Sequence, residues 1–281
     1  MKTGLVLEGG AMRGMFTAGV LDAFLAAGVR ADEVVGVSAG ALFGVNYLSG
    51  QTGRAVRYNK RYNGDKNYMG LRPLLKEGNL FSTSYAYDLV PRKLDPFDDE
   101  AFQNSGVPFY AVVTDVDTGE AEYMQVKSVF EQMDVLRASG SMPFVSRPVE
   151  WQGRRYLDGG VSDSIPFRWM AARGCDRLIV VLTREEGYRK TPMKGALLRL
   201  LRRKYPAIAR RLAARHTDYN RALEELERWQ AEGRAFVIRP SVKTPISRIE
   251  TDPEKLQQVY DLGLADGQAA LPALNAYLAG Q

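Results

Sequence analysis

Apolar residues in this chain gather in short runs that alternate with stretches of helical spacing. Four runs are typical of buried strands, namely residues 5–7, 34–37, 177–183 and 236–238. Apolar side chains recur at helical spacing over residues 15–27, and the spacing predicts a second helix over residues 39–48. The order strand, helix, strand, helix predicts a parallel sheet with right-handed crossovers.

The middle of the chain predicts two hairpins, because strand-forming residues flank a glycine at 107–126 and again at 148–157. Short helices are expected at 127–138 and 166–172. The pattern is weaker over residues 50–105, where tyrosines alternate with basic and small residues. We expect short helices and loops there that line or cover a pocket at the carboxyl edge of the sheet. An irregular insertion that packs on the core is the alternative.

The last third of the chain is expected to be mostly helical. Helical stretches cover residues 217–232 and 252–278, and Pro272 is expected to break the second. We therefore divide the chain into a catalytic domain, residues 1–190, and a helical C-terminal segment, residues 191–281. The strand at 236–238 would let this segment pack on the same domain.

Ser38 stands between two glycines, Gly36 and Gly40, where an apolar run meets a helical stretch. A G-x-S-x-G sequence at a strand-to-helix turn matches the nucleophile elbow, in which glycines let the backbone turn sharply and the serine hydroxyl is exposed. Ser38 is therefore the candidate nucleophile. The alternative is a tight turn whose serine only caps the helix.

A glycine-rich turn follows the first apolar run and consists of Gly9, Gly10, Ala11, Met12, Arg13 and Gly14. Parallel strands end at one edge of a sheet, so this turn and Ser38 should be neighbours. Its N–H groups can hold a phosphate or the oxyanion of an acyl-transfer intermediate. The P-loop Lys-Ser/Thr pair and G-x-G-x-x-G spacing are missing, which favours the oxyanion hole over a phosphate site. A plain strand-to-helix connection is the alternative.

Asp158 ends the second hairpin and is followed by two glycines. A carboxylate at a strand end, beside residues that let the backbone pass closely, is well placed to contact a catalytic group. Taken alone, however, Asp-Gly-Gly is more typical of an ordinary turn. Asp115 and Asp117 lie close in sequence without an accompanying His or Glu cluster, so we expect no metal site.

Positive charge is concentrated in one segment. The chain has 38 Lys and Arg against 33 Asp and Glu, a net charge of +5, and the segment Lys194–His216 holds eight of the basic residues and no acidic one. Pro206 is expected to divide this segment into two helices. We expect its charges to form a solvated outer face. Contact with an anionic membrane surface is the alternative.

The composition, 45% hydrophobic and 25% charged, is typical of a globular protein. Cys175 is the only cysteine, which rules out an internal disulfide and fits a reducing compartment. The sequence begins without the apolar run of a signal peptide, and no stretch reaches the roughly 20 apolar residues that span a bilayer. We expect a cytoplasmic location, with peripheral contact to the inner face of the membrane left open, and no nucleic-acid partner.

Four of these stretches together resemble the patatin-like phospholipases, in particular the bacterial members. The family pattern has a G-G-G-x-R/K-G turn, a G-x-S-x-G elbow, an Ala-Ser-x-x-x-Pro segment and a D-G-G or D-G-A end. The corresponding stretches here, in the same order, are Gly9–Gly14 (GGAMRG), Gly36–Gly40 (GVSAG), Ala138–Pro143 (ASGSMP) and Asp158–Gly160 (DGG). The resemblance covers residues 4–185 and leaves the last third without a motif.

The resemblance implies a three-layer α/β/α fold with a mainly parallel sheet, and a hydrolase of phospholipids or other fatty-acyl esters that needs no cofactor. It also implies a catalytic dyad, with Ser38 as nucleophile, Asp158 as base, and N–H groups around Gly10 and Ala11 as the oxyanion hole. Alanine replaces the third glycine of the family turn, and alanine resists a positive φ. Arg13 matches the family's basic position and is expected to steady the turn or attract an anionic head group.

His216 is the only histidine, and Ser38, Asp158 and His216 stand in the order of an α/β-hydrolase triad. Only one strand precedes the elbow strand, and we expect His216 at the end of a basic helix with no strand before it. The dyad is therefore preferred and the triad is the alternative. Two other functions stay open: a soluble carboxylesterase or thioesterase that uses the same dyad, and a non-enzymatic lipid- or anion-binding protein.

Overall fold

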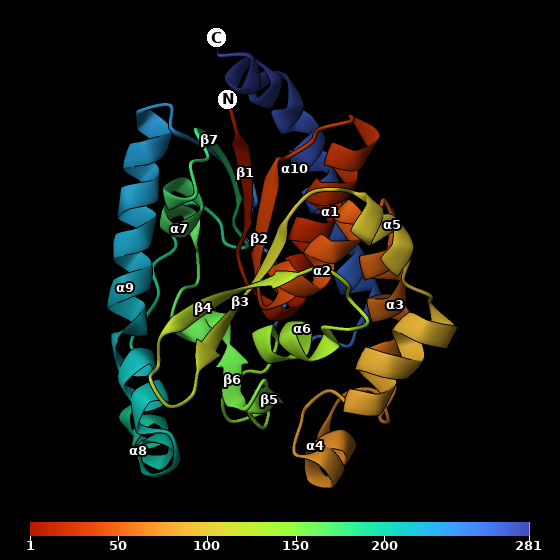
Figure 1. Ribbon diagram of the computed structural model, residues 1–281, viewed down its shortest axis with the longest axis vertical. Coiled ribbons are helices and arrows are strands. Elements are labelled where there is room, and N and C mark those ends of the chain that lie inside the picture. Colours follow the sequence, from red (N-terminus) through yellow and green to blue (C-terminus); the bar gives the residue numbers. More distant parts are fainter. Residues whose placement is uncertain (281) are drawn as a thin grey trace.

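The structure is a computed structural model that describes residues 1–280. Its centre is an eight-stranded sheet with helices on both faces (Figure 1). The strands are β1 Thr3–Leu7, β2 Glu33–Val37, β3 Phe109–Asp115, β4 Ala121–Val126, β5 Val149–Trp151, β6 Arg154–Asp158, β7 Arg177–Val181 and β8 Ala235–Ile238. Seven strands follow one another in the order β5-β6-β3-β2-β1-β7-β8. The eighth strand, β4, lies outside this order and pairs with β3.

The helices follow the predicted alternation with the strands in the first 50 residues. They are α1 Gly14–Ala26, α2 Ala39–Leu48, α3 Arg54–Tyr62, α4 Leu71–Glu77, α5 Asp99–Asn104, α6 Met133–Ser139, α7 Phe167–Ala172, α8 Gly195–Lys204, α9 Pro206–Ala231 and α10 Pro253–Ala279. Two short 3-10 turns, η1 Ala11–Arg13 and η3 Gly159–Val161, and a π-helical segment, η2 Tyr85–Leu94, complete the helical elements.

The predicted mixed α/β fold with a mainly parallel sheet is confirmed. Strands β1, β2, β3, β7 and β8 run parallel to one another, whereas β4 and β6 are antiparallel to β3. Both predicted hairpins are present, as β3–β4 and β5–β6. In β1, Leu5 and Leu7 join the core on one face and Val6 joins the core on the other, as the two-residue period of a strand requires.

The two faces of the sheet are covered by different helices. Helices α1, α2 and α10 lie on one side and α7 and α9 on the other, which gives three layers (Figure 1). Helix α10 approaches α1 closely because both carry glycine at the contact: a Cβ on Gly19 would lie 2.1 Å from the Tyr260 carbonyl oxygen, and one on Gly263 would lie 2.0 Å from that of Phe16. The C-terminal segment therefore packs on the same sheet, while its separation at residue 190 stays a prediction.

Two helical predictions differ from the structure. Pro272 lies inside α10 and does not end it, and the long contact of α10 with α1 offsets the hydrogen bond that proline cannot donate. Pro206 does divide the basic segment, because it begins α9 at a position where no N–H donor is needed. Helix α9 then continues unbroken to Ala231, so His216 lies in its interior and not at the end of a helix. Among residues 1–280, no helix has the length and apolarity to cross a membrane.

Candidate active site

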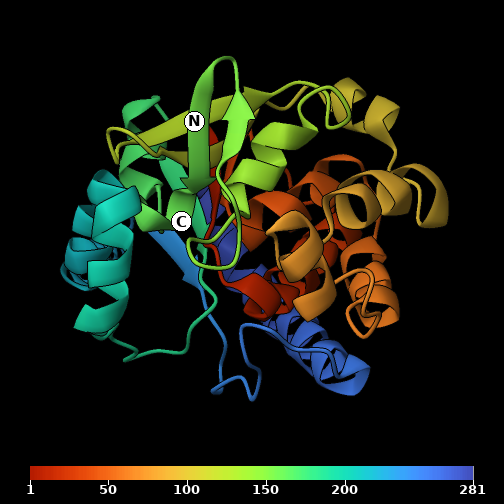
Figure 2. The same cartoon turned by 90° about the horizontal axis from the view of Figure 1, so that it is seen from below.

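The candidate site lies where the first two parallel strands end. Figure 2 looks from below onto this edge of the sheet. Leu7 of β1 pairs with Gly36 of β2, so two residues further on Gly9 comes beside Ser38. A Cβ on Gly9 would lie 2.8 Å from the Val37 carbonyl oxygen and 2.9 Å from the Ser38 Cβ. The glycine-rich turn and the predicted elbow are therefore in contact, and no side chain fits between them.

Ser38 itself makes the sharp turn between β2 and α2, with φ of 55° and ψ of −122°. A non-glycine residue in this region stores about 1–3 kcal/mol of strain, which is typical of functional sites. Neither Gly36 nor Gly40 has a positive φ, so the two glycines do not permit the sharp turn through their own backbone angles. They are needed for space instead: a Cβ on Gly36 would lie 2.6 Å from the Ala41 backbone, and one on Gly40 would lie 2.4 Å from the Leu7 carbonyl oxygen.

Ser38 and Asp158 are joined by a short hydrogen bond, in which Ser38 Oγ donates to Asp158 Oδ2 at 2.6 Å. The other carboxylate oxygen, Oδ1, accepts from the Gly160 N–H at 2.7 Å. Both side chains are buried. Burial raises the pKa of Asp158, while its two hydrogen bonds and the charges of Arg215 and Arg248 act in the opposite direction. Asp158 is therefore positioned to take the Ser38 proton.

Asp158 reaches Ser38 because β6 runs antiparallel to β3. Val113 of β3 pairs with Asp158, and the preceding residue, Val112, pairs with Val37 of β2. A Cβ on Gly159 would lie 2.2 Å from the Val112 carbonyl oxygen. The first glycine after the aspartate thus lets the chain pass tightly over β3, which the Asp-Gly-Gly sequence alone did not establish.

Ser139 has a role that the sequence reasoning missed. Its Oγ accepts from the Ser38 N–H at 2.9 Å and donates to the Val112 carbonyl oxygen at 2.7 Å. The hydroxyl is buried and ties the elbow to β3. It also occupies the Ser38 N–H, so this group is not free to stabilise an oxyanion. The signal was present in the Ala138–Pro143 motif, but nothing in the sequence indicates which atom of the motif makes contact.

The glycine-rich turn holds three N–H groups without a partner in the described residues. Met12 N–H donates to the Arg248 carbonyl oxygen at 3.4 Å and Arg13 N–H to that of Gly10 at 3.2 Å. Within residues 1–280, the N–H groups of Gly9, Gly10 and Ala11 have no acceptor. Ala11 adopts φ of 49° despite its Cβ, so alanine takes the conformation that it was expected to resist.

Gly10 and Gly14 pack tightly around this turn. A Cβ on Gly10 would lie 2.7 Å from Thr183 Oγ1, at the end of β7. One on Gly14 would lie 2.8 Å from the Ala39 Cβ and from the Phe43 ring. Glycine at position 14 lets α1 start directly beside α2, so both helices begin at the candidate site.

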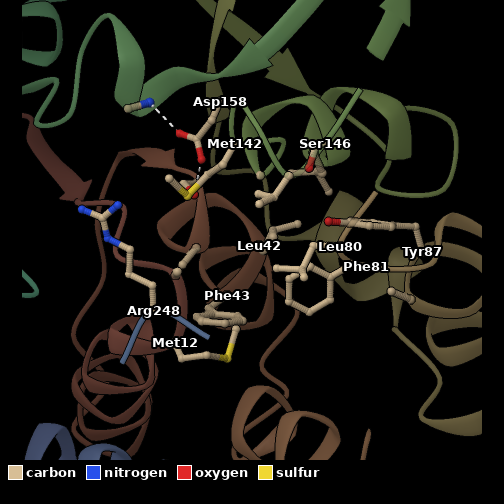
Figure 3. A pocket seen from close by; sticks show the side chains of 18 of the residues that line it. Met12, Leu42, Phe43, Leu80, Phe81, Tyr87, Met142, Ser146, Asp158 and Arg248 are labelled. Carbon is tan, nitrogen blue, oxygen red and sulfur yellow. Dashed lines mark hydrogen bonds between the residues drawn. The ribbon is translucent and has the colours of Figure 1, made fainter. Parts of the chain in front are cut away.

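A large apolar cavity opens beside Ser38, with a volume of about 370 Å³. Its wall comes from α2, α3, η2 and the loop after α6, and its apolar lining includes Leu42, Phe43, Tyr58, Tyr68, Leu80, Phe81, Tyr87, Met142 and Phe144. Figure 3 shows Asp158 and Arg248 on one side, and Leu80, Phe81 and Tyr87 on the other. Residues from segment 50–105 line this cavity, which bears out the first of the two alternatives for that segment.

A second, smaller cavity of about 30 Å³ shares Ser38 and Asp158 with the first. Its lining is polar and includes the cationic side chains of Arg13, Arg184, Lys190, Arg215 and Arg248. Of these, the sequence reasoning had singled out only Arg13. The other four come from three separate segments after β7, and no local pattern indicates that they converge. Arg215 belongs to the basic segment, so that segment is not solely a solvated outer face.

Other candidate residues lie away from both cavities. His216 contacts the Ala213 carbonyl oxygen and Thr217 Oγ1 and lines neither cavity. Asp115 accepts from the N–H groups of Asp117 and Thr118 in a turn. In the part of the chain that the structure describes, no group of three or more His, Cys, Asp or Glu is arranged to hold a metal ion.

Comparison with known proteins gives the family. A family model described as patatin-like phospholipase matches residues 5–170, and one described as a domain of unknown function (DUF6363) matches residues 205–279. The chain is 33% identical over 186 residues to an uncharacterized protein of Escherichia coli, YjjU, which covers 65% of this chain and 52% of that protein. It is 27% identical over 290 residues to lysophospholipase NTE1 of Candida glabrata, covering 96% of this chain and 16% of that protein.

The chain thus spans about half, or less, of the length of these relatives. Among solved structures, VipD of Legionella pneumophila aligns with a TM-score of 0.46 and 14% identity over 97% of this chain and 67% of that chain. The family match contains all four motifs and covers more than half of the chain. The chain belongs to the patatin-like phospholipase family.

Proposed function

We propose that this protein is a serine acyl hydrolase of lipids, of the phospholipase A or lysophospholipase type. The observation that carries the proposal is the 2.6 Å hydrogen bond from Ser38 Oγ to Asp158 Oδ2 at the opening of an apolar cavity of about 370 Å³. A nucleophile bonded to its base beside an apolar pocket is suited to the ester of a fatty acid. The family match and the relative named lysophospholipase support the same class of substrate.

The proposed reaction has two steps. As Ser38 Oγ attacks the ester carbonyl carbon, Asp158 accepts the hydroxyl proton and later gives it to the departing alcohol oxygen. A water molecule then attacks the acyl-enzyme, loses its proton to Asp158, and releases the fatty acid as Ser38 regains its hydrogen. The free N–H groups of Gly10 and Ala11 are the proposed donors to the oxyanion that forms in each step.

A dyad is favoured over a triad because His216 lines neither cavity. We expect His216→Ala to retain most of the activity and Asp158→Asn to lose nearly all of it, measured as kcat/KM on the same ester. A collapse of His216→Ala to the level of Asp158→Asn would overturn the dyad.

The most direct test of the proposal is labelling by a fluorophosphonate that reacts with serine hydrolases. Labelling of the wild type is expected to disappear in Ser38→Ala and to persist in Ser141→Ala, a neighbouring serine whose hydroxyl bonds only to the Arg137 carbonyl oxygen. An unlabelled wild type, under conditions that label a known serine hydrolase, would contradict the enzymatic proposal and favour a lipid-binding protein instead.

A soluble carboxylesterase or thioesterase would use the same residues. The size of the apolar cavity favours a long acyl chain over the short esters of such enzymes. Assays on phospholipid vesicles, short water-soluble esters and acyl thioesters distinguish the three. Higher kcat/KM on the short esters or thioesters than on dispersed lipids would contradict the lipid assignment.

Helix α8 is the proposed point of contact with an anionic membrane, from the inner face if the protein is cytoplasmic. Its Leu197 and Leu200 are 43% and 67% exposed. Arg199, Arg202, Arg203 and Lys204 surround them in sequence, and Leu197 also lines the apolar cavity. Binding to anionic vesicles should weaken with added salt and in Leu200→Asp. Vesicle binding that neither added salt nor Leu200→Asp weakens would contradict this role.

A further inference from the structure

The small cavity beside Ser38 gathers five cationic side chains from four segments of the chain. Arg13 belongs to the glycine-rich turn, Arg184 and Lys190 lie after β7, Arg215 is on α9, and Arg248 lies between β8 and α10. All except Arg13 lie beyond residue 170, outside the match to the patatin-like family. The positive charge of the cavity therefore comes mostly from the C-terminal part of this chain.

These cations are not neutralised by the protein. Within residues 1–280, none of the five forms an ion pair with a carboxylate. Two carboxylates line the cavity, Glu8 and Asp158, and both are occupied. Glu8 accepts from the Thr183 N–H and hydroxyl and from the Tyr219 hydroxyl, and Asp158 is bonded to Ser38 and Gly160.

Two of the guanidinium groups also hold unused donors. The Nε atoms of Arg13 and Arg184 are buried and have no hydrogen-bond partner within the described residues. A buried donor without an acceptor is costly, so each such group in a folded protein calls for an explanation. Both side chains line the same cavity.

The cations also destabilise one another. Burial and the charge of Arg184 lower the pKa of Arg13 to about 10, and burial together with Arg215 lowers the pKa of Lys190 to about 7. Aromatic rings hold two of the side chains: Lys190 Nζ lies 4.0 Å from the centroid of Tyr219, and the Arg184 guanidinium lies 4.3 Å from that of Tyr188. A bound anion would offset this repulsion and favour the charged form of Lys190.

From this geometry we propose that the cavity binds the phosphate group of the substrate, and that the protein acts on acyl esters of a phosphorylated alcohol with a compact phosphate head. The inference rests on the proposed function and names its substrate class. Ser38 borders both cavities, so an acyl chain in the apolar cavity and a phosphate in the cationic one place the ester between them, at the nucleophile. Guanidinium groups bind phosphate through two parallel hydrogen bonds, which a neutral head group without acceptors in this geometry does not offer.

The test compares two lipids that share one acyl chain: a monoacylglycerol phosphate with a terminal phosphate, and the neutral monoacylglycerol, both dispersed in a neutral detergent. For the wild type, kcat/KM is expected to be at least tenfold higher on the phosphate lipid. Arg184→Gln and Arg248→Gln should each reduce this ratio about tenfold, mainly through KM, and Arg248→Lys should restore part of it. Arg221→Gln, which changes an exposed arginine on α9, is the matched control and should keep the wild-type ratio.

A binding measurement separates this inference from the proposed function. Ser38→Ala is titrated with the two lipids and with inorganic phosphate, and the phosphate lipid should bind most tightly. Adding Arg248→Gln to this variant should weaken the binding of the phosphate lipid. Equal binding of the two lipids would overturn the phosphate subsite. So would a kcat/KM ratio between the phosphate and neutral lipids that Arg184→Gln and Arg248→Gln leave unchanged. Neither result would contradict the proposed ester hydrolysis. Binding of inorganic phosphate without preference for the phosphate lipid overturns the headgroup assignment. Binding of the phosphate lipid by a wild type that hydrolyses neither lipid refutes the enzyme and keeps the subsite.

Discussion

The two cavities that meet at Ser38 differ in chemistry and in origin. The apolar cavity is built mainly by residues within the family match, such as Leu42, Phe81 and Met142. The cationic cavity takes four of its five cations from beyond the match, and two of these, Arg184 and Lys190, do not line the apolar cavity. We propose that the part of the chain within the family match supplies the nucleophile and the acyl site, and that the later part supplies selectivity for the head group.

Removing the base should break activity toward every substrate. Asp158→Asn keeps the shape of the side chain but cannot accept the Ser38 proton, and we expect kcat/KM to fall by about 10⁴-fold or more. The ratio between the phosphate lipid and the neutral lipid should persist in whatever activity remains, because the cationic cavity is intact. Loss of less than tenfold would show that another group serves as the base.

Disturbing the oxyanion donors should come next in size. In Gly10→Ala the new Cβ would lie 2.7 Å from Thr183 Oγ1, so the N–H groups of Gly10 and Ala11 must shift. Loss of one such donor costs about 10²–10³-fold in kcat. Gly64→Ala is the matched control, since a Cβ there meets nothing within 4 Å. Equal kinetics for the two variants would exclude the turn from the oxyanion hole.

The pH profile should reveal the environment of Asp158. Only the ionised carboxylate can accept the Ser38 proton, so activity is lost as pH falls through the pKa of Asp158. Burial raises that pKa, and the loss should therefore begin at a higher pH than for an ordinary aspartate. Below the pKa, kcat/KM should fall about tenfold per pH unit. A profile that stays flat down to the usual pKa of aspartate, about 3.9, would contradict this environment.

Filling the apolar cavity should change only the preference for the length of the acyl chain. Leu42→Trp places a larger ring in the cavity and should lower the ratio of kcat/KM on long-chain to short-chain esters by about tenfold. A single methylene in an apolar pocket changes such a ratio of kcat/KM by about 10- to 200-fold. Leu75→Trp on α4 changes a leucine that is 85% exposed and outside both cavities. An unchanged ratio in Leu42→Trp would place the acyl chain elsewhere.

The smallest expected effect is on stability and comes from loss of the hydrogen bond between the Ser38 N–H and Ser139 Oγ. Ser139→Ala leaves the buried Ser38 N–H without an acceptor, and we expect the free energy of unfolding to fall by about 1–3 kcal/mol. Ser141→Ala removes a hydroxyl that only donates to the Arg137 carbonyl oxygen and should cost less. Denaturant unfolding of the two variants makes the comparison, and a larger loss in Ser141→Ala would contradict the role given to Ser139.

The sequence allowed prediction of the features that depend on local pattern. The apolar runs at 5–7, 34–37 and 177–183 indicated β1, β2 and β7, and their alternation with helices indicated a parallel sheet. The register of that sheet then brings Gly9 beside Ser38. Proximity of the glycine-rich turn to the elbow was therefore predictable from the order of strands and helices alone.

The features that the sequence could not reveal depend on packing between residues far apart in the chain. The positive φ of Ser38 depends on the backbone contacts of Gly36 and Gly40, and the role of Ser139 depends on the edge of β3. Arg184 and Arg248 meet only because β7 and β8 pair and α10 packs on α1. Pro272 was misread because local propensity gave no weight to that tertiary contact.

The central claim is that Ser38 carries the acyl group during turnover. It is tested most directly by acid quenching of the enzyme during hydrolysis of a long-chain ester, followed by peptide mass spectrometry. We expect an acyl adduct on the peptide that contains Ser38, absent from Ser38→Ala and stronger for the long-chain ester than for a short one. An adduct on another residue, or sustained hydrolysis by Ser38→Ala, would contradict it.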